Sequence, residues 1–255
     1  MERKQSDSLF RKPLMSILFL LGLTVMVSSC TKDVGVCLSS TGQVIREIRT
    51  LPVFTKIDMQ DNISLVLIQD TVCRVEVEAG QKIISGIRTE VIDGQLILQN
   101  FNQCNWLRDY SKPINVYVYS DTLWKITYNS SGDITSNGTL KMDSLKVIVW
   151  GGCGTIDLTL DIWQGSFSLN MGTVDIRLHG VCAVNSVFTG DYGMFDGRDL
   201  RTGYTFITNK GSNDSYIQAT NEIDATILSI GNIYYRGNPC NIKSKILGSG
   251  QLLPF

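Results

Sequence analysis

Four aspartates occupy the same place in a glycine-marked pattern in the second half of the chain. Each follows a glycine by three residues, at Asp157, Asp175, Asp196 and Asp214. If the fold brings equivalent positions together, these carboxylates lie in one file. Such a file would suit Ca²⁺, which prefers hard oxygen ligands, or an enzyme that cleaves glycosidic bonds with paired carboxylates. The third interpretation is a solvated turn position, where Asp is favoured.

Arginines two residues further on bear on this choice. Residues two apart on a strand share a face, so we expect Arg177 beside Asp175 and Arg198 beside Asp196. Because the arginines would neutralise the aspartates, this pattern favours the interpretation that the aspartates occupy solvated turn positions. A Ca²⁺ site and a polysaccharide lyase or hydrolase that uses the four aspartates remain the alternatives.

The chain has one histidine, which makes His-based triads and His-rich metal sites implausible. We place His179 in a turn before Gly180, away from acids or cysteines at ligand spacing. There is no GxGxxG after a strand, no P-loop and no GxSxG. The sequence therefore assigns no catalytic, cofactor-binding or metal-binding residue, and we expect neither a cofactor nor a metal.

The first thirty residues resemble the signal of a bacterial lipoprotein. A basic start precedes the uncharged run 14–27, which is too short to span a bilayer comfortably but has the length of a signal core. Val27-Ser28-Ser29-Cys30 then resembles a lipobox. We expect a signal peptide over 1–29, lipid attachment at Cys30, and a tether over 30–50.

The residues after Cys30 give an expected location. The absence of Asp directly after the cysteine resembles lipoproteins sorted to the outer membrane, and Lys32-Asp33 resembles a surface-export signal of Bacteroidetes lipoproteins. We therefore expect an outer-membrane, lipid-anchored protein that faces the periplasm or the cell surface, with the membrane as a partner.

Six further cysteines lie in a compartment that permits disulfides. They allow 15 pairings, and buried thiols in a β core are the equally weighted alternative. No CxxC occurs, which disfavours a zinc ribbon. The six are Cys37, Cys73, Cys104, Cys153, Cys182 and Cys240.

Composition indicates a single folded body without affinity for nucleic acid. The 255 residues are 43% hydrophobic, enough for one sizeable core. Lys and Arg total 23 against 24 Asp and Glu, so a footprint for nucleic-acid phosphates is missing. Polar and apolar residues alternate with a period of two, as in Arg74–Glu78, and no sustained helical period follows Cys30. The chain is therefore expected to be all-β.

A repeat selects among all-β architectures. The glycines at 132, 154, 172, 193, 211, 231 and 250 are about 20 residues apart. Two residues after each glycine the chain is apolar in six of seven units, with Ile156, Val174 and Ile233 among them. A unit this short must stack on copies of itself. We predict a single-stranded, right-handed parallel β-helix over 51–255, with about ten coils from residue 54 and an irregular or hairpin-capped stretch over 54–125.

The order of motifs resembles the family described as putative auto-transporter adhesin, head GIN domain. The resemblance covers roughly residues 50–253 and implies a β-helix at the bacterial envelope, but it transfers no functional residue. The segments that carry it are Phe54-Thr-Lys-Ile-Asp-Met, Asn62-Ile-Ser-Leu-Val-Leu, Val75-Glu-Val-Glu, Gly94-Gln-Leu-Ile-Leu, Ile114-Asn-Val-Tyr-Val, Ser131-Gly132-Asp133-Ile134, Ile233-Tyr-Tyr-Arg-Gly237-Asn238-Pro239 and Gly248-Ser-Gly250.

These observations together favour a non-enzymatic envelope lipoprotein, an adhesin or scaffold that presents a β-helix face to a glycan or an envelope protein. Exposed aromatics would serve such a face, with Tyr117 and Tyr119 directed outward and Tyr234 and Tyr235 pointing opposite ways. The alternatives are the carbohydrate-active enzyme above and an assembly protein, including a homo-oligomer, whose open coil end pairs with a partner strand.

Overall fold

The computed structural model describes residues 40–103 and 113–255, so the expected signal peptide and Cys30 lie outside the described residues. None of the described residues belongs to a helix with the length and hydropathy needed to cross a membrane. The elements in chain order are β1 (Val44–Arg49), β2 (Lys56–Asp61), β3 (Ile63–Ile68), β4 (Arg74–Gly80), the 3₁₀ turn η1 (Ile84–Gly86), β5 (Ile87–Ile92), β6 (Gln95–Asn100), β7 (Ile114–Tyr119), β8 (Lys125–Ser130), β9 (Ile134–Gly152), β10 (Thr155–Leu169), β11 (Asp175–Thr189), β12 (Phe195–Asn209), β13 (Ser215–Ile227), β14 (Ile233–Arg236), β15 (Asn241–Ile246) and β16 (Leu252–Pro254).

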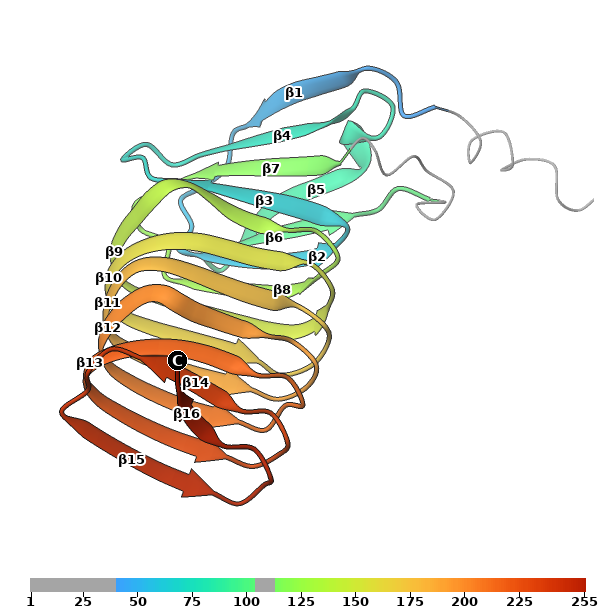
Figure 1. Cartoon of the computed structure of the whole chain (residues 1–255). Coiled ribbons are helices and arrows are strands. Elements are labelled where there is room, and N and C mark those ends of the chain that lie inside the picture. The colour runs from blue at the N-terminus through green and yellow to red at the C-terminus, as the bar shows by residue number, and fades with distance from the viewer. Residues whose placement is uncertain (1–39, 104–112) are drawn as a thin grey trace, which may run out of the picture. The chain divides into compact units, whose positions relative to one another are not determined.

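The strands build the predicted parallel β-solenoid. Strands β9 to β13 bend midway and stack in parallel, each hydrogen-bonded to the next (Figure 1). Their first halves continue β3 and lead to β14 and β16, and we call this the first face. Their second halves continue β2 and β8 and lead to β15, and we call this the second face.

The N-terminal part departs from the simple spiral. Strands β1, β4 and β7 pair antiparallel, and β5 and β6 form a hairpin through Asp93 (φ 50°) and Gly94 (φ 71°). Asp-Gly suits a turn with two positive φ angles. The expectation of a hairpin-capped stretch is confirmed, and because these residues form no separate coils the solenoid has about six turns; the prediction of ten was wrong. Strand β1 also lies inside the range 30–50 that we expected to be a tether.

The interior is a set of apolar columns. One column passes through Ile134, Ile156, Ile176, Phe195, Ser215, Ile233 and Leu252. The prediction placed Val174 where Ile176 lies. Val174 is nevertheless fully buried, because a residue two positions earlier points the same way.

The repeat glycines mark corners where successive coils touch. At Gly172 φ is +98°, and an added Cβ would lie 2.5 Å from the carbonyl oxygen of Gly152. Gly231 has no positive φ, yet a Cβ added to it would lie 2.2 Å from the carbonyl oxygen of Asn213. Close approach of backbones thus selects glycine even where the torsion angle does not.

Candidate functional site

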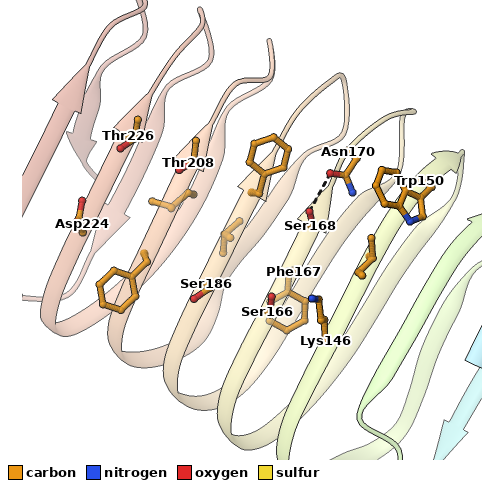
Figure 2. Close-up of a pocket in the computed structure, with 15 residues that line it drawn as sticks. Lys146, Trp150, Ser166, Phe167, Ser168, Asn170, Ser186, Thr208, Asp224 and Thr226 are labelled. Atoms are coloured by element: carbon orange, nitrogen blue, oxygen red, sulfur yellow. Dashed lines mark hydrogen bonds between the residues drawn. The ribbon is translucent and has the colours of Figure 1, made fainter. Parts of the chain in front are cut away.

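A groove of about 550 Å³ crosses the second face over strands β9 to β13 (Figure 2). Large apolar side chains contribute to its lining, with Ile148 and Trp150 on β9, Phe188 on β11 and Phe206 on β12. Trp150 is 52% exposed and Phe206 is 41% exposed. The rings are therefore available to a ligand.

The floor of the groove is made of small polar side chains. Ser166 and Ser186 lie in register between Lys146 and Phe206. Side chains alternate across a strand, so Phe167 and its equivalents point into the core while the serines point outward. The small serine side chains of β10 and β11 leave space beside the larger side chains of β9, β11 and β12.

The groove offers hydroxyl and amide groups as well as rings. The Ser168 hydroxyl donates to Asn170 Oδ1 at 3.3 Å, and Asn170 Nδ2 donates to the carbonyl oxygen of Val149 at 3.0 Å. These contacts fix the orientation of the amide. Within the described residues no hydrogen bond uses the hydroxyls of Ser166 or Ser186. Lys146 and Asp224 lie toward opposite ends of the groove, in the same register column.

The four aspartates of the glycine pattern do not form one file, so that prediction was wrong. Asp157 is paired with Arg177 of the next coil, and Arg177 is paired with Asp196. Asp175 instead pairs with Thr155, and Asp214 precedes β13. The reason is that coil length varies, so equal spacing from a glycine does not give equal register.

Each of these carboxylates also has a partner. Asp196 accepts a hydrogen bond from Arg198 Nε at 2.7 Å, and Asp175 lies 3.9 Å from Arg177, so both expected pairs are confirmed. Asp175 further accepts from the backbone N–H of Met194 at 3.1 Å. The arrangement therefore does not present a row of unpartnered acids for a cation or for catalysis.

His179 lies within β11 and not in a turn as predicted, although Gly180 with φ +99° follows it. Its Nε2 is 3.2 Å from Asp157 Oδ1 and its Nδ1 is 3.8 Å from Asp199 Oδ2. Arg236 reaches Asp199 at 2.9 Å. The network links four coils, and in residues 40–103 and 113–255 no group of three His, Cys, Asp or Glu side chains could hold a metal ion.

The tyrosines that we expected to face outward lie against arginines of β1 and β4. The guanidinium of Arg46 is 3.9 Å from the ring centroid of Tyr117, and that of Arg74 is 3.9 Å from Tyr119. Glu78 lies among Asn115, Arg46 and Tyr117; their hydrogen bonds outweigh the effect of burial, so the pKa of Glu78 lies below its ordinary value. These contacts join β1, β4 and β7 and belong to the cap of the solenoid.

Another aromatic cluster closes the first face near the C-terminus. Tyr216 and Tyr234 stack with ring centroids 5.3 Å apart, and Phe255 packs edge-on against Tyr216. Tyr235 packs against the core instead, which fits the expectation that Tyr234 and Tyr235 point opposite ways.

The cysteines fit the buried-thiol expectation in one case. Among the described residues Cys73, Cys153, Cys182 and Cys240 are free, and of these only Cys182 is buried. Cys37 and Cys104 lie outside the described residues.

Sequence reasoning missed the groove. The sequence feature that could have revealed the groove is the alternation Ser166-Phe-Ser168, together with Lys146, Ile148 and Trp150. These two segments become neighbours only through the register of β9 and β10.

Comparison with known proteins gives a family and a fold. The model of the family described as "Putative auto-transporter adhesin, head GIN domain" matches residues 53–239. No curated protein sequence matches the chain.

Solved structures share the architecture. A putative adhesin from Bacteroides fragilis is 23% identical, with a TM-score of 0.76 over 84% of this chain and 97% of that one. A protein from Parabacteroides distasonis described as a putative lipid binding protein is 17% identical, with a TM-score of 0.61 over 85% of this chain and 98% of that one. A putative adhesin from Parabacteroides merdae gives the same TM-score, identity and coverage.

Proposed function

Because this chain belongs to the family described as "Putative auto-transporter adhesin, head GIN domain", we propose that it is a non-enzymatic binding module of the cell envelope whose groove holds a carbohydrate chain. The observation that carries the proposal is the pairing of exposed rings with a hydroxyl-lined floor between Trp150 and Phe206. The apolar faces of sugar rings stack on aromatic side chains, and their hydroxyls exchange hydrogen bonds with serine and asparagine.

The direction of the groove also suits a polymer. It crosses five stacked strands, which spans roughly 19 Å at about 4.8 Å per strand. Several linked sugars could therefore contact the serines and the rings at once. A protein strand would seek an open sheet edge instead, whereas these strands are paired on both sides.

A glycan array with the purified full-length protein tests the proposal. We expect binding to at least one extended glycan and a loss of about tenfold in affinity for Trp150→Ala, the size of one stacking contact. Trp163→Ala is the matched control, because Trp163 is 69% exposed and lies outside the groove. No glycan binding, or an equal effect of both variants, would overturn the proposal.

We further propose that Cys30 carries the lipid that holds the module at the outer membrane. Cys30→Ser is expected to abolish lipid labelling and to move the protein out of the membrane fraction. External protease on whole cells then separates the two orientations, since digestion indicates a surface-exposed adhesin and protection a periplasmic module.

Incubation of the protein with a glycan that it binds tests for catalysis. We expect no shortened or unsaturated products, because Asp157, Asp175 and Asp196 are held by neighbouring side chains or backbone. If such products form and are absent with an Asp175→Asn/Asp196→Asn double variant, the interpretation as a carbohydrate-active enzyme is correct.

A further inference from the structure

Three lysines lie side by side on the second face. Lys56 of β2 is in register with Lys125 of β8, and Lys125 is in register with Lys146 of β9. Adjacent strands are about 4.8 Å apart, and like charges directly opposite one another destabilise a sheet. We call these three residues the lysine ladder.

Within the described part of the chain the lysine ladder has no carboxylate partner, like Lys82 and Lys210 but unlike Lys141 and Lys243. No carboxylate of the described residues lies within ion-pair distance of any of its three ammonium groups. By contrast, Lys243 reaches Glu222 at 2.7 Å and Lys141 reaches Asp161 at 4.0 Å. Asp58 is on the same face as Lys56, but the contact of its carboxylate is with the Gln60 amide at 3.4 Å.

The ladder is continuous with the groove. Lys146 lines one end of the groove, and its register column runs on through Ser166 and Ser186. A chain lying along the serines and extending past Lys146 would pass over Lys125 and then Lys56. Three unpaired ammonium groups on that path would each gain a charge-assisted hydrogen bond from an anionic substituent.

We propose that the lysine ladder makes the groove selective for an acidic polysaccharide, with carboxylate or sulfate groups on successive sugars. This inference rests on the proposed carbohydrate-binding function. The ladder is a single file beside a hydroxyl-lined groove, a shape that fits a linear polymer better than the plane of a membrane. The overall balance of 23 basic and 24 acidic residues gives no broad basic surface for nucleic acid.

The test compares acidic glycans with neutral forms of the same chain. Polygalacturonate, alginate, hyaluronan and a sulfated galactan are measured with the full-length protein beside their carboxyl-reduced or desulfated forms. We expect at least one acidic form to bind about tenfold or more tightly than its neutral form, an advantage equivalent to one hydrogen bond to a charged group. Added salt should reduce that advantage.

The decisive variant is Lys56→Gln/Lys125→Gln/Lys146→Gln. It should remove the preference for the acidic form, so that the acidic and neutral forms of the same chain bind this variant with equal affinity. The matched control is Lys82→Gln/Lys210→Gln/Lys245→Gln, which removes the same charge from exposed lysines outside the ladder that have no carboxylate partner among the described residues. Unfolding curves of both variants show that each is folded.

The outcomes separate the two proposals. If glycans bind through Trp150 but the ladder variant keeps its preference, or the control variant loses it equally, the ladder inference is wrong and the proposed function stands. If no glycan binds, or Trp150→Ala has no effect, the proposed function itself fails. Stronger ladder-dependent binding to phosphatidylglycerol vesicles than to any glycan would also overturn the inference in favour of a lipid surface.

Discussion

The side-chain Oδ1 of Asp214 accepts a hydrogen bond from the backbone N–H of Asn232, 2.8 Å away on the next coil. Asn232 repeats the contact one coil further on, where its Oδ1 accepts from the N–H of Gln251 at 2.9 Å. Asp133 does the same for Thr155. These residues tie each coil to the next at the point where a strand begins.

The repetition by Asn232 predicts that Asp214 acts as an acceptor and not as a charge. Asp214→Ala should lower the free energy of unfolding by about 1 kcal/mol, the typical value of one such hydrogen bond. Asp214→Asn keeps an acceptor oxygen and should restore most of the loss. Urea unfolding measures the stability of both variants. If the asparagine variant is as unstable as the alanine variant, the loss of stability comes from the loss of charge and not of an acceptor.

Close coil contact predicts that Gly211 tolerates no side chain. Its φ is not positive, but a Cβ would lie 2.5 Å from the carbonyl oxygen of Asp191. We expect Gly211→Ala to cost about 3 kcal/mol, as overpacking does. At Gly138, φ is +88° and no atom lies near the added Cβ, so Gly138→Ala should cost about 1 kcal/mol from torsional strain alone. Equal losses in thermal unfolding would mean that coil contact is not the cause.

A buried phenol should make stability depend on pH in alkali. The hydroxyl of Tyr128 shares its single proton between the carbonyl oxygens of Gly132 at 2.8 Å and Cys153 at 2.9 Å, and burial raises the pKa of Tyr128 well above its ordinary value. In the unfolded chain the phenol ionises near pH 10. The unfolded state therefore binds fewer protons above about pH 10, and the contribution of Tyr128, full below that pH, declines as pH rises toward the folded pKa.

The corresponding variant is Tyr128→Phe. It leaves two carbonyl groups without their donor and should lower stability at pH 8 by about 1–3 kcal/mol. It should also reduce the fall in stability between pH 8 and pH 11. The residual slope belongs to groups such as Tyr117, whose pKa is raised chiefly by burial. An unchanged slope would show that Tyr128 ionises normally in the folded protein.

Thiol accessibility gives a test of the packing. Burial raises the pKa of the Cys182 thiol to about 11, and its side chain contacts the carbonyl oxygen of Val184 at 3.1 Å. Few thiolates form at pH 8 under these conditions. Iodoacetamide should label the exposed Cys153 and Cys240 in the folded protein and reach Cys182 only after unfolding. Peptide mass spectrometry at successive times reads all three sites, and equal rates would show that the core opens there.

Several parts of the fold followed from residue types alone. Alternation identified inward positions correctly at Ile156 and Ile233, and the glycine spacing indicated stacked coils of about 20 residues. The column position in the third long coil was assigned to Val174, while the structure has Ile176 there. Alternation fixes the face of a residue, but the length of each corner fixes its column, and corner length varies from coil to coil.

The all-β class and the parity of the core positions follow from the order of residues alone, because alternation has the two-residue period of a strand, and the glycine spacing marks the corners. The groove and the lysine ladder depend on how the coils stack. Lys56 and Lys125 are neighbours because β2 and β8 pair directly, although the five strands β3 to β7 separate them along the chain. Such pairing across distant segments is set by how whole coils stack, so it cannot be obtained from spacing along the chain.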